Sequence, residues 1–122
     1  MAKILHLPTH VDSRGKLTVI EKVLPFEIKR VYYIYDCSDV ERGGHRHAKN
    51  AQALACVKGS CEIEWSDGRD SGIVILDSPS ILLVVMPEDF HTMRKFSEDA
   101  VLLVLASEYF DPDDYIDEGH QS

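Results

Sequence analysis

Short apolar runs separated by turn residues make up most of the chain. Runs of β-branched, aromatic and other apolar residues that predict strands occupy residues 16–20, 31–35, 53–57, 61–65, 73–76, 81–85 and 101–105. Segments typical of turns lie at 12–15, 58–60 and 66–68, each with a glycine. Strands at this spacing predict an all-β fold, either a sandwich or a small barrel.

Helical periodicity is hard to find before the last residues of the chain. There Asp111 can cap a short helix that Pro112 opens, so we expect a short helical segment over residues 112–116. Neither an internal repeat nor a low-complexity linker interrupts the pattern. A single domain over residues 1–122 is therefore expected, with an acidic tail over about 107–122.

The 122 residues carry a formal net charge of −8, and most of that charge lies at one end. Residues 107–122 hold six acidic and no basic side chains, which leaves 13 basic and 15 acidic residues in the rest of the chain. The body is thus nearly neutral and has no basic stripe to displace the counterions of a nucleic acid polymer. The charge argues against a nucleic acid partner but is compatible with a small anionic ligand.

The cytoplasm is the location that the sequence favours. The chain has no apolar run of about 18 residues, and its first residues are too short a segment for a secretory signal. The three cysteines, Cys37, Cys56 and Cys61, are an odd number without a CxxC pair. Buried thiols of this kind fit a reducing compartment. We therefore expect a cytoplasmic protein with no membrane partner.

The segment that carries most chemistry is 42–52, which reads RGGHRHAKNAQ. Side chains alternate along an extended strand, so His45 and His47 are expected on the same face. Two imidazoles side by side can hold a metal ion or transfer protons near neutral pH. A third histidine, His91, follows a proline turn after the apolar run 81–85. A single histidine is more often a surface or core residue, but this combination favours a functional site.

This arrangement resembles the cupin pattern, in which HxH is followed by Glu, then by Gly, and later by a histidine after a proline turn. Here Gln52 stands at the position of the glutamate, and Gly59 follows at the family's spacing. The segment from Pro87 to His91 is one residue shorter than the family's second motif. A neutral amide is a poor ligand for a hard divalent ion, so the full metal-ligand set of the cupins is absent. A metal-dependent cupin, dioxygenase or epimerase-like, with the three histidines as ligands remains an alternative.

A longer series of segments resembles one group of cupins, the sugar 3,4-ketoisomerases that act on dTDP-4-keto-6-deoxyglucose. The segments occur in the same order and read PFEIKRVYYI, RGGHRH, LDSP and VLASEYFD, at residues 25–34, 42–47, 76–79 and 104–111. The match extends from about residue 15 to 116 and covers nearly the whole chain. It implies a jelly-roll-like cupin barrel without a metal or other cofactor, usually a homodimer that exchanges N-terminal strands.

The resemblance also assigns chemistry to particular residues. Moving a ketone from C4 to C3 through an enediol needs a base at C3 and an acid at C4, and one histidine can serve both steps. By resemblance His47 shuttles the proton, and His45 assists by orienting or polarising the sugar oxygens. Tyr33 has the family's position on the neighbouring strand, where its hydroxyl would bond the developing enediolate. A core aromatic residue is the alternative for Tyr33.

Substrate binding needs cations for the diphosphate and polar groups for the hexose. The candidate cations are Arg14, Arg30, Arg42 and Lys49. Arginine is preferred because its planar guanidinium matches phosphate geometry. Arg46 is disfavoured, since it alternates away from the two histidines on the same strand. By resemblance Gln52 hydrogen-bonds the hexose.

Two positions bear on the configuration of the product. Arg14, and a histidine rather than an arginine at position 91, resemble the branch of the family that forms the galacto 3-keto sugar. His91 is accordingly expected to contact the substrate. Such a product would feed an aminotransferase and yield a 3-amino-3,6-dideoxyhexose for surface polysaccharide. A third hypothesis is a cupin that binds the sugar nucleotide without changing it.

Overall fold

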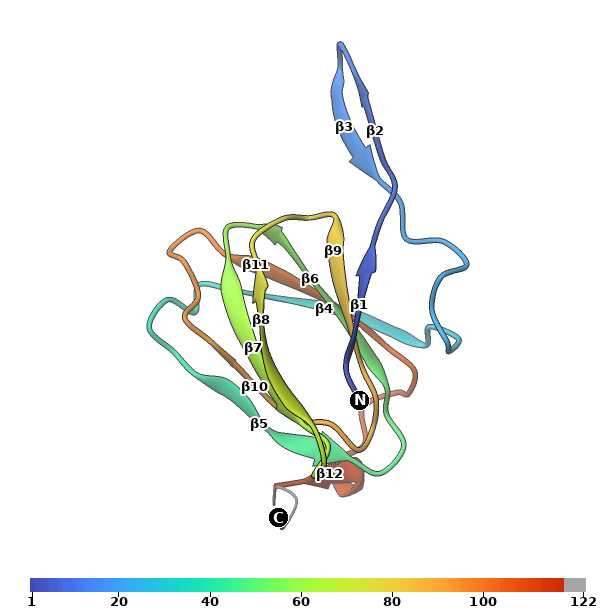
Figure 1. Ribbon diagram of the computed structural model, residues 1–122, viewed down its shortest axis with the longest axis vertical. Coiled ribbons are helices and arrows are strands. Elements are labelled where there is room, and N and C mark those ends of the chain that lie inside the picture. The colour runs from blue at the N-terminus through green and yellow to red at the C-terminus, as the bar shows by residue number, and fades with distance from the viewer. Residues whose placement is uncertain (118–122) are drawn as a thin grey trace.

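The computed structural model describes residues 1–117 and consists almost entirely of β-strands (Figure 1). The strands are β1 (Lys3–His6), β2 (Thr9–Asp12), β3 (Gly15–Thr18), β4 (Arg30–Tyr35), β5 (Arg42–His47), β6 (Gln52–Lys58), β7 (Cys61–Ser66), β8 (Ser71–Leu76), β9 (Ile81–Val85), β10 (Phe90–Arg94), β11 (Val101–Ala106) and β12 (Tyr115–Ile116). One turn of 3₁₀-helix, η1 (Pro112–Asp114), precedes the last strand. No helix in the described part of the chain is long and apolar enough to cross a membrane.

Two five-stranded sheets face each other and form the barrel (Figure 1). The first sheet has the order β1-β9-β6-β11-β4 and the second the order β12-β5-β10-β7-β8. All pairings between their strands are antiparallel. The apolar runs expected to be strands form β4, β6, β7, β8, β9 and β11. The prediction of an all-β barrel is therefore confirmed.

The space between the two sheets is filled by the main hydrophobic core. Leu54 and Leu102 enter it from the first sheet and Ile63 from the second, and all three are buried. Burying one such side chain stabilises the fold by about 1.5–3 kcal/mol. A smaller cluster, which includes Ala53 and Leu82, covers the opposite face of the first sheet and packs against the segment after β3.

Alternation along β4 separates the interior of the barrel from its outer surface. Tyr32 and Ile34 point inward, whereas Tyr33 between them points outward and is 63% exposed. The paired strand β11 agrees with this division. Val104, opposite Tyr32, belongs to the main core, and Leu103, opposite Tyr33, packs on the outer cluster. This division decides which tyrosine of β4 can contact a ligand inside the barrel.

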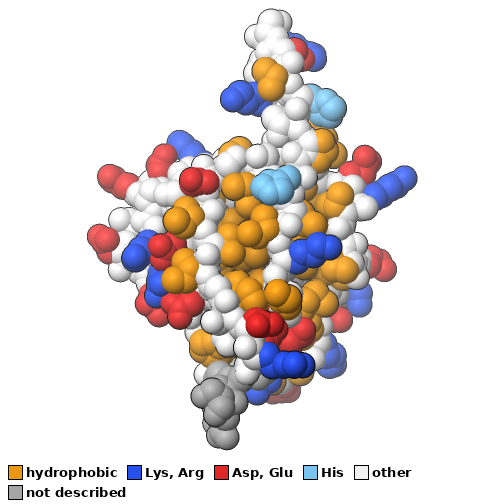
Figure 2. All heavy atoms as spheres, in the orientation of Figure 1, with side chains coloured by type: hydrophobic (Ala, Val, Ile, Leu, Met, Phe, Trp, Pro, Cys, Tyr) orange, Lys and Arg blue, Asp and Glu red, His pale blue; other side chains and the backbone are white. Residues whose placement is uncertain are grey.

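Strands β2 and β3 form a hairpin that projects away from the barrel (Figure 1). Within the described chain they pair only with each other, and every residue of β2 is exposed. The predicted turn at 12–15 is confirmed, with Asp12 accepting a hydrogen bond of 2.8 Å from the amide of Arg14. The strand expected over 16–20 is present as β3 but ends at Thr18. Figure 2 shows apolar side chains gathered on the face of the barrel below this hairpin.

The apolar pattern does not predict β1, β2, β5, β10 or β12, which are short or mostly polar. The prediction of a C-terminal helix is right for η1, where Asp111 caps the turn and accepts a hydrogen bond of 3.0 Å from the amide of Asp113. The chain then returns to an extended strand at Tyr115 instead of continuing the helix. Residues 118–122 of the expected acidic tail lie outside the described residues.

The predicted turn between β6 and β7 depends on Gly59. Its φ of +70° lies in the left-handed region, which glycine adopts without steric cost. A Cβ at this position would lie 2.8 Å from Cα of Ala100 and would also collide with the side chains of Ser97 and Asp99. Gly59 is therefore required both by the turn and by the close approach of the segment before β11.

Replacing Gly59 with alanine should destabilise the protein more than the same change at Gly44. Both glycines have positive φ, +70° and +76°, and a left-handed conformation costs alanine about 1–2 kcal/mol. Only Gly59 adds a steric clash, because a Cβ at Gly44 meets no atom within 4 Å beyond its chain neighbours. Urea unfolding of both variants measures the difference, and equal free energies of unfolding would contradict this account of the turn.

Candidate active site

Three histidines from two neighbouring strands meet inside the barrel. His45 and His47 share one face of β5, and His91 on β10 is paired directly with His45. The ring centroid of His45 lies 5.0 Å from that of His47 and 5.4 Å from that of His91. His47 and His91 lie 6.4 Å apart. The sequence prediction that His45 and His47 face the same side agrees with this arrangement.

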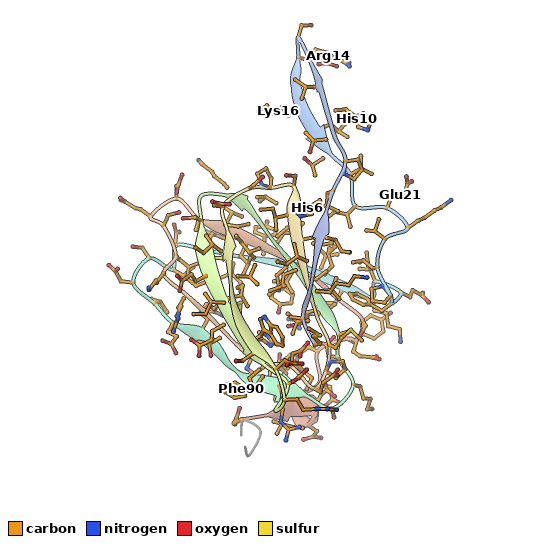
Figure 3. All side chains as sticks on the ribbon, viewed as in Figure 1. His6, His10, Arg14, Lys16, Glu21 and Phe90 are labelled. Atoms are coloured by element: carbon orange, nitrogen blue, oxygen red, sulfur yellow. The ribbon has the colours of Figure 1, made fainter. Side chains whose placement is uncertain are left out.

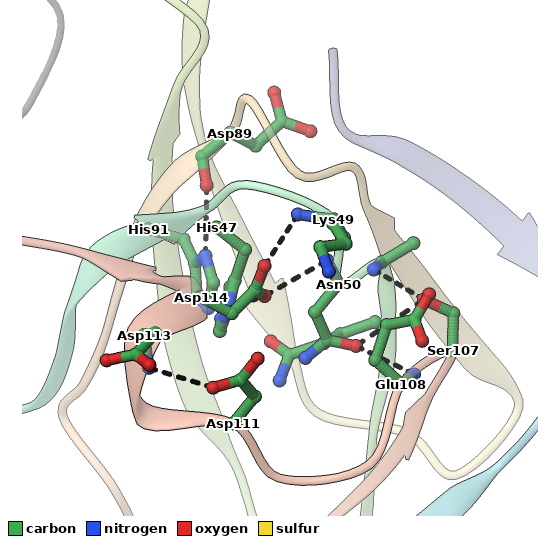
Figure 4. Close-up of polar contacts among 12 residues, drawn as sticks. His47, Lys49, Asn50, Asp89, His91, Ser107, Glu108, Asp111, Asp113 and Asp114 are labelled. Carbon is green, nitrogen blue, oxygen red and sulfur yellow. Dashed lines mark hydrogen bonds and ion pairs between the residues drawn. The ribbon is translucent and has the colours of Figure 1, made fainter.

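His47 is almost completely buried and is bonded through one ring nitrogen (Figure 4). Its Nδ1 lies 3.0 Å from Oδ2 of Asp114. Burial lowers the pKa of His47, and the neighbouring Asp114 acts in the opposite direction. Nε2 of His47 has no hydrogen-bond partner within residues 1–117. This nitrogen is therefore buried and unsatisfied within the described residues.

Asp114 joins the C-terminal segment to the turn after β5. Its Oδ1 accepts a hydrogen bond of 2.8 Å from the amide of Lys49, and its Oδ2 accepts one of 3.2 Å from the amide of Asn50. Its backbone carbonyl accepts a third from the amide of Ala48, at 3.0 Å. The next residue, Tyr115, pairs with His47 across β12 and β5. The short helix η1 thus fixes both the turn and the histidine.

His91 is held in a different way from His47. Its side chain is 1% exposed, and its Nδ1 donates a hydrogen bond of 3.1 Å to the backbone carbonyl of Asp89. Burial lowers the pKa of His91 to about 4, with smaller contributions from the other two histidines. Burial and the charge of His47 also lower the pKa of His45. Burial therefore favours the uncharged form of all three imidazoles.

A cavity of about 520 Å³ opens beside His45, and neither His47 nor His91 is among its lining residues. His45, Tyr115 and Gln52 line it together with residues of β4. Gln52 is 3% exposed and donates a hydrogen bond of 3.1 Å from Nε2 to the hydroxyl of Tyr32. Burial raises the pKa of Tyr32, which keeps the hydroxyl protonated. The volume lies within the range of about 300–1,000 Å³ that is typical of small-ligand sites.

Two of the four candidate cations line this cavity. They are Arg30 and Arg42. The guanidinium of Arg30 lies over the ring of Tyr32 at 4.4 Å and that of Phe110 at 5.4 Å, which orients it at the cavity wall. Lys49 borders a separate hollow of about 290 Å³ on the other side of Asp114. Arg46, disfavoured from the sequence, is not among the residues that line the main cavity.

Arg14 lies far from the histidines of its own chain. It stands at the tip of the projecting hairpin (Figure 3). Its Nη2 donates a hydrogen bond of 2.6 Å to Oδ2 of Asp12, and the side chain is 90% exposed. The structure does not bring Arg14 together with the other expected binding residues within one chain.

Tyr33 is among the residues that line the cavity with His45, but its side chain is 63% exposed. It faces the outer surface and stacks on Tyr35, with ring centroids 5.8 Å apart. Both faces of β4 carry aromatic or β-branched side chains, so the sequence did not indicate which face is internal. Tyr32 and Tyr115 supply the tyrosine side chains next to the site, and the ring of Tyr115 lies 4.7 Å from His45 and 4.6 Å from His47.

Sequence reasoning also missed Asp114. The segment DPDD indicated a capped turn, but no local pattern connects it with a histidine 67 positions earlier. Within residues 1–117, no group of three His, Cys, Asp or Glu side chains has a geometry that could hold a metal ion. The three histidines nevertheless present two Nε2 atoms without partners, those of His47 and His91.

Comparison with known proteins gives a consistent family assignment. The model of the family FdtA, described as "WxcM-like, C-terminal", matches residues 1–121. A TDP-4-oxo-6-deoxy-alpha-D-glucose-3,4-oxoisomerase from Aneurinibacillus thermoaerophilus is 47% identical over 117 residues, which are 93% of this chain and 84% of that protein.

Solved structures of similar proteins share the fold. A 3,4-ketoisomerase from Helicobacter canadensis has a TM-score of 0.91 and 44% identity, covering 96% of this chain and 90% of its own. The 3,4-ketoisomerase QdtA from Thermoanaerobacterium thermosaccharolyticum, as a histidine-to-asparagine mutant in complex with TDP-4-keto-6-deoxyglucose, has a TM-score of 0.90. It is 41% identical, over 96% of this chain and 87% of its own. The chain therefore belongs to the FdtA family, and it is an isomerase of the 3,4-ketoisomerase type.

Proposed function

We propose that this enzyme converts dTDP-4-keto-6-deoxyglucose into a dTDP-3-keto-6-deoxyhexose through an enediol. The observation that carries the proposal is His47, whose buried Nε2 has no partner in the described chain and whose ring lies beside His45 and Tyr115, two residues that line the cavity. A relative at 41% identity binds this 4-keto sugar nucleotide. The position of the HxH pair and the substrate of that relative together support the assignment.

His47 is the group that moves the proton. Its Nε2 takes the proton from C3, and the electron pair forms the C3–C4 double bond as the C4 carbonyl becomes an enolate oxygen. The resulting imidazolium lies 3.0 Å from Asp114, which stabilises its charge. Return of the proton to C4, with transfer of the O3 proton to O4, completes the ketone at C3. One buried histidine can therefore serve as base and then as acid.

The neighbouring polar groups stabilise the enediolate. His45 polarises or orients the sugar oxygens, as the sequence suggested, and Tyr115 lies against both histidine rings. Tyr32, rather than the outward-facing Tyr33, carries the hydroxyl that is held inside the barrel by Gln52. An oriented hydroxyl near the developing negative charge lowers the energy of the transition state. Gln52 also hydrogen-bonds the hexose.

Arg30 and Arg42 bind the diphosphate. Both line the cavity, and the guanidinium of Arg30 is already oriented between two aromatic rings. Guanidinium groups make paired hydrogen bonds to phosphate oxygens. Lys49 contributes positive charge for the diphosphate from a separate hollow, which it lines together with Asp114. His91 contacts the sugar through its unpartnered Nε2.

The functional unit is a homodimer in which the hairpins of β2 and β3 are exchanged. Support comes from the exposure of Val11 and Leu17, at 68% and 60%, on a hairpin that pairs only with itself among the described residues. Exchange would bury this apolar surface and bring Arg14 to the cavity of the partner. Arg14 and His91 then favour the galacto 3-keto product.

The wider role follows from the chemistry of the product. A 3-keto sugar nucleotide is the substrate that an aminotransferase needs to form a 3-amino-3,6-dideoxyhexose for surface polysaccharide or lipopolysaccharide. The chain acts as a single domain over residues 1–122, in the cytoplasm and without a cofactor. A metal-dependent cupin reaction is the second candidate, because the Nε2 atoms of His47 and His91 both lack a partner among residues 1–117.

Incubating dTDP-4-keto-6-deoxyglucose with the protein should give the signals of a 3-keto sugar in the proton NMR spectrum. His47→Asn should lower turnover by about 10²–10⁴-fold, because the proton acceptor is lost, while TDP binding by calorimetry stays close to that of the wild type. His6→Asn, an exposed histidine on β1, is the matched control and should remain active. Normal turnover by His47→Asn would refute the mechanism.

Metal analysis separates the two candidate reactions. The isomerase should contain substoichiometric metal after purification and keep its turnover after incubation with EDTA, because its proton transfers use imidazole alone. Stoichiometric iron, manganese or zinc, together with activity that EDTA removes and the metal restores, would establish the metal-dependent alternative instead.

Light scattering should give the mass of a dimer, and complementation tests the exchange of hairpins. Arg14→Ala and His47→Asn subunits are each expected to have low turnover alone. When the two are co-expressed, a mixed dimer contains one cavity with an intact His47 and the intact Arg14 of its partner, so turnover should return. A monomer, or no gain in turnover for isolated mixed dimers, would contradict the exchange.

A further inference from the structure

Among the described residues, the carboxylate of Asp114 contacts two backbone amides and one histidine ring. The side chain is 6% exposed and receives the amide of Lys49 on Oδ1 and the amide of Asn50 on Oδ2. Its third contact is Nδ1 of His47, at 3.0 Å (Figure 4). The two backbone amides can only donate, so both oxygens of Asp114 act as hydrogen-bond acceptors.

The acceptor role of the Asp114 oxygens determines the tautomer of His47. An ionised carboxylate accepts hydrogen bonds and has none to donate, so the contact requires a proton on Nδ1. A neutral imidazole carries one ring proton, which leaves Nε2 with a free lone pair. The unpartnered Nε2 of His47 is therefore the proton acceptor of the site. With the other tautomer, two lone pairs would face each other across 3.0 Å.

The other groups around His47 do not fix its tautomer. His45 and His91 approach as rings, with centroids 5.0 Å and 6.4 Å away, and Tyr115 packs its ring at 4.6 Å. None of the three has a hydrogen bond to His47 within residues 1–117. His91 is oriented separately, by the carbonyl of Asp89. Within residues 1–117, Asp114 is the carboxylate in contact with His47, and its charge can balance an imidazolium at this position.

We propose that Asp114 is the positioning residue of the reaction: it holds His47 in the tautomer protonated at Nδ1, so that Nε2 faces the substrate as a base. This inference rests on the proposed function of His47. It also gives η1 a role in the chemistry, because this single helical turn presents Asp114 to strand β5. Asp114 itself does not touch the sugar.

Asparagine at this position would reverse the geometry. Its one amide oxygen can replace only one of the two carboxylate oxygens that bind the amides of Lys49 and Asn50. If the oxygen stays with Lys49, the amide nitrogen faces Nδ1 of His47 and donates to it. The histidine would then carry its proton on Nε2 and could not accept one from C3.

Nitrogen NMR of the wild-type protein tests the tautomer without any turnover. A protonated ring nitrogen and one with a lone pair resonate in separate regions of the ¹⁵N spectrum. With ¹⁵N-labelled histidine, and His47 assigned by the His47→Asn spectrum, Nδ1 should be protonated and Nε2 unprotonated at pH 8. A proton on Nε2 would overturn the proposal, whether or not the enzyme proves to be an isomerase.

Asp114→Asn tests the consequence, with Asp113→Asn as the control. Asp113 is an exposed carboxylate on the same helical turn, so its variant changes the net charge equally and should behave like the wild type. Asp114→Asn should lower kcat by about 10²–10⁴-fold, with little change in KM, and should move the ¹⁵N signals of His47 to the other tautomer.

The pH profile separates positioning from a structural role. Asp114 raises the pKa of His47 against the effect of burial, so the acid limb of kcat/KM in Asp114→Asn should move to lower pH. The neighbours His45, His91 and Tyr115 are unchanged in this variant. If Asp114→Asn loses kcat while the acid limb of kcat/KM and the ¹⁵N signals of His47 stay as in the wild type, Asp114 has only a structural role and the proposal is wrong. If the wild type proves inactive but has the expected tautomer, the proposed function fails and the positioning geometry stands.

Discussion

The contact between Asp114 and His47 is the interaction on which the site depends. One buried carboxylate closes the turn after β5 through the amides of Lys49 and Asn50 and also holds the imidazole at 3.0 Å. Burial alone would make His47 a weak base, since it penalises the imidazolium. The adjacent negative charge offsets that penalty. A histidine so balanced can both accept and return a proton near neutral pH.

The other residues around the site are placed by the alternation of side chains along the strands of the barrel. Strands β4, β5 and β10 present alternate side chains to the interior, so that Tyr32 and His45 line one cavity and the ring of the buried His91 lies 5.4 Å from that of His45. The apolar core between the sheets excludes water below them, and the arginines of β4 and β5 give the cavity positive charge. A protein with a net charge of −8 thus has two arginines in the wall of this cavity. The net charge of the chain therefore does not predict the charge around this cavity.

The sequence predicted the apolar strands well because strands buried on both faces need nearly continuous apolar runs, as in β6, β9 and β11. It did not predict β5 or β10 from propensity, since their polar side chains serve the cavity rather than the core. The pairing of His45 and His47 could be predicted because residues two positions apart lie on the same face of a strand.

Three features of the structure could not be predicted from local sequence patterns. The sequence did not show that the side chain of Tyr32 points inward and that of Tyr33 outward, because a one-residue change in register reverses which face is internal, and both faces of β4 look suitable. Asp114 contacts His47 through the fold, not through sequence spacing. Arg14 lies at the tip of a hairpin that projects from the barrel, and no sequence pattern indicated that the hairpin stands apart from the histidines.

The pH dependence of solvent-deuterium exchange at C3 of dTDP-4-keto-6-deoxyglucose tests the central claim most directly. Exchange catalysed by the wild-type protein reports removal of the C3 proton by the unprotonated His47. Because burial holds the pKa of His47 below its ordinary value, the exchange rate should rise to a plateau with a midpoint below about pH 6.5. An absence of exchange, or a midpoint above that value, would contradict the assignment of a buried, neutral His47 as the base.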